Sequence, residues 1–147
     1  MTGFEGISSL PVCGYLWSRR GSFASEKVLI LRVLVCGGRH FSDGAFLNSK
    51  LDEVHRQYGF TVLIEGDAVG ADRLAGAWAD ANDLEHLQFP ADWENLKRKA
   101  GPLRNKQMLD EGKPDLIVAF PGTSGTFNMC RQGEAAGVRV ITIPRPE

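Results

Sequence analysis

A chain of 147 residues with 43% hydrophobic and 24% charged residues has the size and composition of one globular domain, large enough to bury a core without disulfides or a structural metal. Its net charge of -1 gives no general electrostatic reason for binding nucleic acid or an anionic membrane. Its apolar runs fall short of the ~20 residues that span a bilayer, and a signal-peptide pattern is missing, so we expect a soluble, cytoplasmic protein.

Residues 1 to about 26 have no period of two or 3.6, mix glycine and serine with isolated aromatics, and contain only two acids, Glu5 and Glu26. We therefore predict an N-terminal extension over 1–30 and a single folded domain over 31–147. A flexible tail, or a start codon placed too early, fits this composition better than a transit peptide, because the stretch is only weakly amphipathic.

The first predicted strand is a continuous apolar run, VLILRVLVCGG, which begins at Val28 and ends in two glycines. Such a run is typical of a central parallel strand buried on both faces, and we place the strand at about 31–36. Cys36 ends the run and is expected to be a small core residue. The three cysteines are widely spaced and odd in number, which favours a reducing compartment over a disulfide framework or a metal site.

Helices and strands alternate over the rest of the chain. A Ser42-Asp43 cap signal predicts a helix to about Tyr58, and ADRLAGAWADAN predicts a second helix with an apolar stripe. The stripe of this second helix consists of Leu74, Ala75, Trp78 and Ala79. Residues 90–101 have no clear period and are expected to form an irregular loop or a short turn of helix. The remaining elements are the strands FTVLIEG, LEHLQF, DLIVAF and VRVITI and the helices GPLRNKQMLDEG and TFNMCRQGEAAG.

Strands that alternate with helices through short turns require parallel pairing with right-handed crossovers. We therefore predict an α/β protein with a three-layer Rossmann-like fold, whose mostly parallel five-stranded sheet has the order 3-2-1-4-5. In such a sheet, ligands bind at the carboxyl ends of the strands where the strand order reverses, which here is between the first and fourth strands.

Three glycine-rich turns follow predicted strands and should meet at this edge: GGRHFSD, EGDAVGAD and PGTSGT. Glycine lets backbone N–H groups approach a phosphate, and a helix N-terminus adds partial positive charge for the same anion. In the third turn, Gly122 and Gly125 leave the backbone N–H groups accessible because they carry no side chain. The hydroxyl groups of Thr123, Ser124 and Thr126 are further donors. We therefore predict a phosphate site in this turn. The complete GxGxxG and GxxxxGK(S/T) patterns are missing, which argues against an NAD dehydrogenase or a P-loop ATPase.

Charged and aromatic residues near these turns have alternative roles. Arg39 can pair with a phosphate or a carboxylate through its planar fork of donors, or serve as a surface residue. Asp67 or Asp72 can accept a hydrogen bond from a ribose hydroxyl or form an ion pair with an arginine. The helix dipole alone also accounts for Asp72, because a negative charge in the first turn of a helix is stabilised by the dipole. Trp93 is expected to pack its loop against the domain, with stacking on a base as the alternative.

Arg104 and Asn105 pose a geometrical problem. They lie in the first turn of the helix predicted before the fourth strand, and the topology places that end of the helix at the opposite edge of the sheet. A helix of about 11 residues spans roughly 16 Å, so the 90–101 loop must carry the start of the helix back to the ligand edge. The loop is long enough to do so.

Four segments together resemble the SLOG superfamily of Rossmann-like proteins, in its YspA/YpsA-related branch from bacteria and phages. They are VLVCGGRHFSD, EGDAVGADRLAGAWA, PADWENLKRKAGPLRNKQML and IVAFPGTSGT. The resemblance runs from about Arg32 to the C-terminus. It implies a site for nucleotides or nucleotide-derived ligands, often in a homodimer.

The enzymatic LOG branch of that superfamily releases a base from a nucleoside monophosphate. Its signature joins an Arg four residues before a Met to a later PGGxGTxxE, and the matching residues here are Arg104, Met108, Pro121, Gly122, Gly125 and Thr126. Thr123 replaces the second glycine, and Asn128 stands where that branch carries its Glu. An amide cannot accept a proton as a carboxylate does, so the hydrolase mechanism does not carry over intact.

The leading hypothesis is a sensor or binding protein for a nucleotide or a nucleotide-derived ligand similar to ADP-ribose, with no metal and no cofactor. The first alternative is a nucleotide N-glycosidic hydrolase in which Arg104 and a non-standard acid, Asp72, are catalytic. The second is a nucleic-acid-associated domain similar to DprA, which a local basic stretch over 97–106 favours. The predicted ligand-binding residues are Gly37, Gly38, Arg39, Gly66, Asp67, Gly70, Asp72, Arg104, Asn105, Pro121, Gly122, Thr123, Ser124, Gly125 and Thr126.

Overall fold

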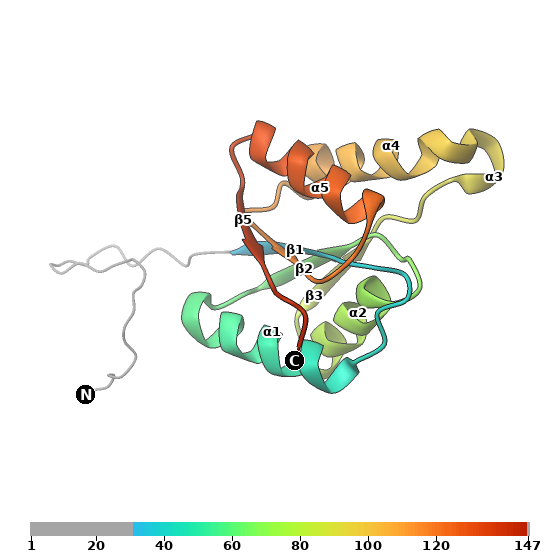
Figure 1. Ribbon diagram of the computed structural model, residues 1–147. Helices are drawn as coiled ribbons and strands as arrows, with labels where there is room; N and C mark the ends of the chain where they lie inside the picture. Colours follow the sequence, from blue (N-terminus) through green and yellow to red (C-terminus); the bar gives the residue numbers. More distant parts are fainter. Residues whose placement is uncertain (1–30, 147) are drawn as a thin grey trace, which may run out of the picture.

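A five-stranded, all-parallel sheet forms the centre of the molecule, in the order β3-β2-β1-β4-β5 (Figure 1). The computed structural model describes residues 31–146, so the extension predicted over 1–30 lies outside the described residues. The strands are β1 (Arg32–Cys36), β2 (Val62–Glu65), β3 (Glu85–Gln88), β4 (Leu116–Ala119) and β5 (Arg139–Thr142). The predicted fold class and strand order are confirmed.

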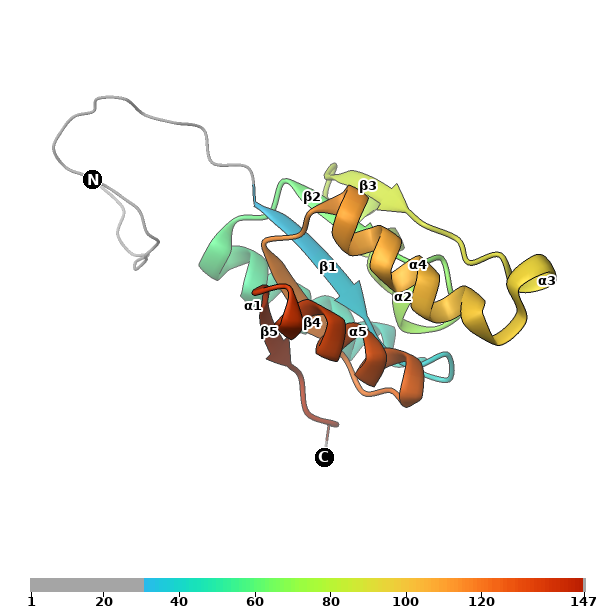
Figure 2. The ribbon, with the colours of Figure 1, turned by 90° about the horizontal axis from the view of Figure 1, so that it is seen from above.

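Helices cover both faces of the sheet and complete the three layers (Figure 1 and Figure 2). One face carries α1 (Gly44–Tyr58) and α2 (Ala71–Ala81). The other face carries α4 (Ala100–Gln107), its π-helical continuation η2 (Met108–Gly112), and α5 (Ser124–Ala135). The connection from β3 to α4 contains the short helix α3 (Trp93–Leu96) and the 3-10 turn η1 (Lys97–Lys99).

An apolar layer lies on each face of the sheet, and successive residues of β1 point into opposite layers. Val33 and Val35 pack with residues of α1 and α2, whereas Leu34 and Cys36 pack with residues of η2 and α5. Burial on both faces explains why the central strands read as continuous apolar runs. Cys36 is buried, as predicted for a core residue.

The helices follow their predicted capping and stripe patterns. Asp43 caps α1 by accepting a hydrogen bond from the Phe46 amide (3.0 Å), and Gly59 ends the helix with a φ of 77°. In α2, Trp78 is 4% exposed and donates a hydrogen bond from Nε1 to Asp52 of α1 (2.9 Å). The predicted stripe of α2 therefore lies in the core.

The segment between β3 and β4 differs most from its prediction. Part of it, 93–96, forms a short helix, which was one of the two predicted alternatives, and α4 begins at Ala100. Arg104 and Asn105 therefore lie in the second turn of α4 rather than in its first. α3 buries none of its residues, which explains why the sequence there shows no apolar period.

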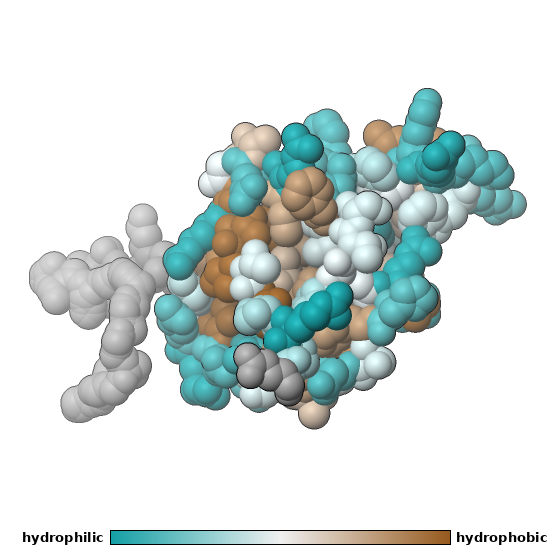
Figure 3. Space-filling view, viewed as in Figure 1, coloured by the Kyte–Doolittle hydropathy of each residue, from teal (hydrophilic) through white to brown (hydrophobic). Residues whose placement is uncertain are grey.

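The sheet has two edge strands, β3 and β5, and the described residues contain no membrane-spanning helix. Figure 3 shows an apolar strip over the edge formed by β5, where Val140 and Ile141 are only partly buried. Within 31–146, no helix combines the length and the apolar character needed to cross a membrane.

Candidate functional site

The turns after β1, β2 and β4 meet at the carboxyl edge of the sheet. The Gly38 amide donates a hydrogen bond to the Pro121 carbonyl (2.9 Å), and the Gly38 carbonyl accepts one from the Ala71 amide (3.1 Å). One residue of the first turn thus joins the other two turns. The structure brings together the three turns that the sequence places at this edge, as expected where the strand order reverses between β1 and β4.

Glycine is required where these turns pass one another. Gly70 has a φ of 97°, and a Cβ there would lie 2.6 Å from the Arg39 carbonyl oxygen. A Cβ at Gly122 would collide with the Thr126 hydroxyl and would lie 2.9 Å from the Gly38 nitrogen. The close crossing of the turns therefore requires glycine at these two positions, whether or not a ligand binds there.

The turn after β4 opens directly into α5. The helix begins at Ser124, so Ser124, Gly125 and Thr126 form its first turn rather than part of the preceding loop. Thr123 is the N-cap residue, but its side chain makes no capping hydrogen bond. Since 122–125 are exposed, the first N–H groups of α5 lack a side-chain acceptor and face an open surface. Such a terminus attracts an anion.

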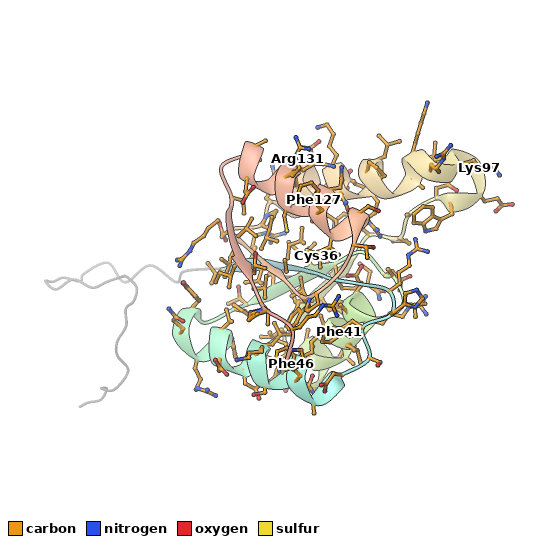
Figure 4. All side chains as sticks on the ribbon, viewed as in Figure 1. Cys36, Phe41, Phe46, Lys97, Phe127 and Arg131 are labelled. Atoms are coloured by element: carbon orange, nitrogen blue, oxygen red, sulfur yellow. The ribbon has the colours of Figure 1, made fainter. Side chains whose placement is uncertain are left out.

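Aromatic packing fixes the turn after β1. The Phe41 ring lies 6.4 Å from the centroid of Phe46, which Figure 4 labels beside it, and 5.7 Å from that of Phe120. Arg39, two residues earlier, is exposed, and its guanidinium lies 4.6 Å from the centroid of the Trp93 ring. Within 31–146 no carboxylate forms an ion pair with Arg39. Its charge is available to a ligand.

Asp72 organises the turn after β2. Its side chain is buried, and Oδ2 accepts hydrogen bonds from the amides of Gly66 (3.1 Å) and Ala68 (3.3 Å). Burial raises the pKa of Asp72 to about 6; the charge of Arg104 opposes this rise, and the charge of Glu65 adds to it. Asp67 lies one residue after Gly66 with a φ of 57° and forms an ion pair with Arg73 (3.3 Å).

Glu65, at the end of β2, is a residue of this site that sequence reasoning missed. Its side chain is fully buried, and it accepts hydrogen bonds from the Asp67 amide and from Gln88 Nε2 (3.0 Å). Its Oε2 also lies 2.6 Å from Nε2 of His86, which in turn contacts Asp80. An acid inside the apolar segment VLIEG was the available signal, because a buried carboxylate needs partners. Its side-chain partners, His86 and Gln88, both come from β3.

Arg104 reaches the ligand edge, so the 90–101 segment does carry α4 back as the sequence required. Its Nη1 donates hydrogen bonds to the carbonyl oxygens of Gly66 and Phe89 (3.4 Å for the latter), and its Nε donates to Asn105 (3.1 Å). Among the described residues, Nη2 has no hydrogen-bond partner. Burial lowers the pKa of Arg104 from its usual value; Asp72 opposes this, and the neighbouring charge of Arg39 adds to it.

Asn105 and Asn128 join α4 to α5 behind this edge. Asn105 is buried, and its Nδ2 donates hydrogen bonds to Asn128 Oδ1 (3.0 Å) and to the Gly125 carbonyl (3.3 Å). Gln132 donates a second hydrogen bond to Asn128 Oδ1 (2.8 Å). The residue at the position of the LOG-branch Glu is thus engaged by two amide donors. Asn105, a predicted ligand-binding residue, has protein partners.

The described residues contain no group of three or more His, Cys, Asp or Glu side chains that could hold a metal ion. The edge carries the guanidinium groups of Arg39 and Arg104 and the carboxyl groups of the β2 turn, of which Asp67 is paired with Arg73. Together with the open N-terminus of α5, they can hold an anion and offer acceptors to a hydroxyl group.

Known proteins resemble this chain in sequence and in fold. The model of the YspA, cpYpsA-related SLOG family matches residues 31–96. Gene 61 protein of Mycobacterium phage D29 is 39% identical over 118 residues, which cover 75% of this chain and 94% of that protein.

A solved structure shows the same fold. DNA processing protein A (DprA) from Streptococcus pneumoniae matches with a TM-score of 0.62 and 17% identity over 80% of this chain and 51% of that chain. The chain thus spans about half the length of DprA, and at this identity the likeness concerns the fold alone. From the matching family model and the phage relative, the chain belongs to the YspA, cpYpsA-related family of the SLOG superfamily, whose members bind nucleotide-derived ligands.

Proposed function

We propose that this protein binds a nucleotide or a nucleotide-derived ligand similar to ADP-ribose, as a sensor or binding protein, at the edge formed by the turns after β1, β2 and β4. The observation that carries the proposal is the pairing of an open helix N-terminus with two arginines. The first turn of α5 is exposed and has no side-chain cap, and within 31–146 neither Arg39 nor Nη2 of Arg104 donates a hydrogen bond to a protein group. A phosphate group satisfies all three.

The acids of the β2 turn support a ribose beside the phosphate. Asp72 uses Oδ2 for two backbone amides, and within 31–146 its Oδ1 has no hydrogen-bond partner. A sugar hydroxyl is a suitable donor for that oxygen. Binding rather than turnover is supported by Asn128, whose amide oxygen already accepts two hydrogen bonds.

Thermal unfolding tests this proposal. A ligand that binds only the native state stabilises it, by about 2.7 kcal/mol at a concentration 100 times its Kd. AMP, ADP-ribose and NAD should therefore be compared, and at least one is expected to raise the Tm. Arg104→Lys keeps the charge but loses the planar fork, so most of this rise should disappear. Arg98→Lys, on an exposed arginine of η1, should leave the rise intact.

A second candidate function is hydrolysis of the N-glycosidic bond of a nucleotide. Asp72 favours it, because a buried carboxyl group with a pKa of about 6 beside Arg104 can act as an acid or a base near neutral pH. The assay is release of free base from a panel of nucleoside monophosphates. Turnover that disappears in Asp72→Asn would support this function, and no release by the wild-type protein would refute it for that panel.

A further inference from the structure

Trp93 is a large aromatic side chain that the protein leaves partly uncovered beside the candidate site. It is the first residue of α3, and its side chain is 44% exposed. Trp78 provides a comparison, because it is 4% exposed and its Nε1 donates to Asp52. Within the described residues, the Trp93 Nε1 has no such partner. Trp93 therefore differs from Trp78, which is buried in the core and hydrogen-bonded through its indole nitrogen.

The Trp93 ring is held in place on two sides. One edge lies against the first turn of α4, where a Cβ at Gly101 would lie 3.3 Å from the ring. One face is covered by the guanidinium of Arg39, at 4.6 Å from the ring centroid. A guanidinium is planar, so this contact marks a place on the ring that accepts a flat group.

The ring is also adjacent to the proposed phosphate position. Arg39 follows Gly38, whose amide is bound to the Pro121 carbonyl of the turn that opens α5. A single arginine side chain thus separates Trp93 from that turn. The positive charge of Arg39 also lowers the pKa of Arg104, so Arg39, which lies over the Trp93 ring, is close enough to Arg104 for their charges to interact. Like charges in proximity favour an anion between them.

We propose that Trp93 is the stacking platform for the ligand, and that the ligand therefore carries an aromatic base in addition to its phosphate. The base takes the place of the guanidinium on the ring, and Arg39 turns toward the phosphate. Phe127 is another exposed aromatic near the site, but the arginine over its ring is Arg131 of the same helix (5.7 Å; Figure 4), whereas the arginine over Trp93 is Arg39 of the proposed phosphate position. This inference rests on the proposed function.

The test compares ligands with and without a base, on the full chain, by calorimetry. The probes are AMP, GMP, CMP and UMP on one side and ribose 5-phosphate on the other. The wild-type protein should bind at least one nucleotide more tightly than ribose 5-phosphate. Trp93→Ala should weaken that nucleotide by about ten-fold or more, the effect of losing one base–aromatic stack, and leave ribose 5-phosphate unchanged. Trp93→Phe should retain most of the affinity.

Leu96→Ala is the matched control, because Leu96 is also exposed on α3 but has no aromatic ring on which a base could stack. It should bind all probes as the wild-type protein does. Equal nucleotide affinity in Trp93→Ala and wild type would overturn the inference, and so would an equal loss for nucleotides and ribose 5-phosphate, which indicates a structural role. If the wild-type protein binds none of these probes and neither ADP-ribose nor NAD, the proposed function and this inference fail together.

Discussion

Asp72 shows how one buried carboxyl group links the shape of the site to pH. Its Oδ2 holds two backbone amides of the β2 turn, yet its burial disfavours the charged form more than Arg104 favours it. The residue is therefore a structural tie that costs stability when it ionises. A neutral amide at the same position keeps an oxygen acceptor for the two amides without that cost.

Asp72→Asn should change the pH dependence of unfolding. The pKa is about 6 in the folded protein and 3.8 ordinarily, so between these values the folded state holds a proton that the unfolded state has lost. The Asp72 contribution to stability is present below about pH 4, falls as the pH rises toward 6, and is level above about 7. Relative to Asp72→Asn, the wild type should lose on the order of 3 kcal/mol over this window. Urea unfolding at several pH values measures it.

A difference between the two proteins that does not vary with pH would contradict this account. A wild type that gains on the variant as the pH rises would also contradict it, because that result means that Arg104 stabilises the carboxylate by more than burial penalises it.

Glu65 and Arg104 could not be placed at the site from their local sequence alone. The partners of Glu65 are His86 and Gln88, 21 and 23 residues away, and only the pairing of β2 with β3 brings them together. No local pattern encodes such a contact. Arg104 entered the predicted site through the family resemblance, because topology alone argued against it.

At the scale of elements, the strands and glycine turns followed from the sequence because their physical causes are local. β1 and β4 are buried on both faces, which requires uninterrupted apolar residues, and the turns need glycine where backbones cross. The segment 93–99 buries no side chain, so its sequence has no apolar period that would predict the short helix or the residues at which it begins and ends.

The crossing of the β1 and β4 turns predicts different effects for two glycines of the same motif. Gly122→Ala places a Cβ against the Thr126 hydroxyl and 2.9 Å from the Gly38 nitrogen, whereas a Cβ at Gly125 meets nothing within 4 Å. Gly122→Ala should destabilise the protein by about 1–3 kcal/mol and weaken ligand binding. Gly125→Ala should leave stability nearly unchanged. Chemical denaturation of both variants measures the difference, and equal stability of the two would refute the close crossing.

At the scale of the whole molecule, residues 31–146 contain the five-stranded sheet and an apolar layer on each of its faces. We therefore expect a variant that lacks residues 1–30 to fold and to bind the same ligands. Its Tm should stay within about 5 °C of the full-length value, which corresponds to roughly 1 kcal/mol for a domain of this size. A larger fall, or loss of binding, would show that the extension is part of the domain.

The homodimer that the family resemblance implies stays a prediction, which light scattering can check.

The central claim is that the ligand binds across the three turns at the carboxyl edge of the sheet. The most direct measurement is NMR mapping of backbone amide shifts during titration with the nucleotide that stabilises the protein most. We predict that the largest changes fall on 37–39, 66–70 and 122–126. Shifts confined to the β5 edge or to the outer surface of α1, or no saturable shift with any nucleotide, would contradict the claim.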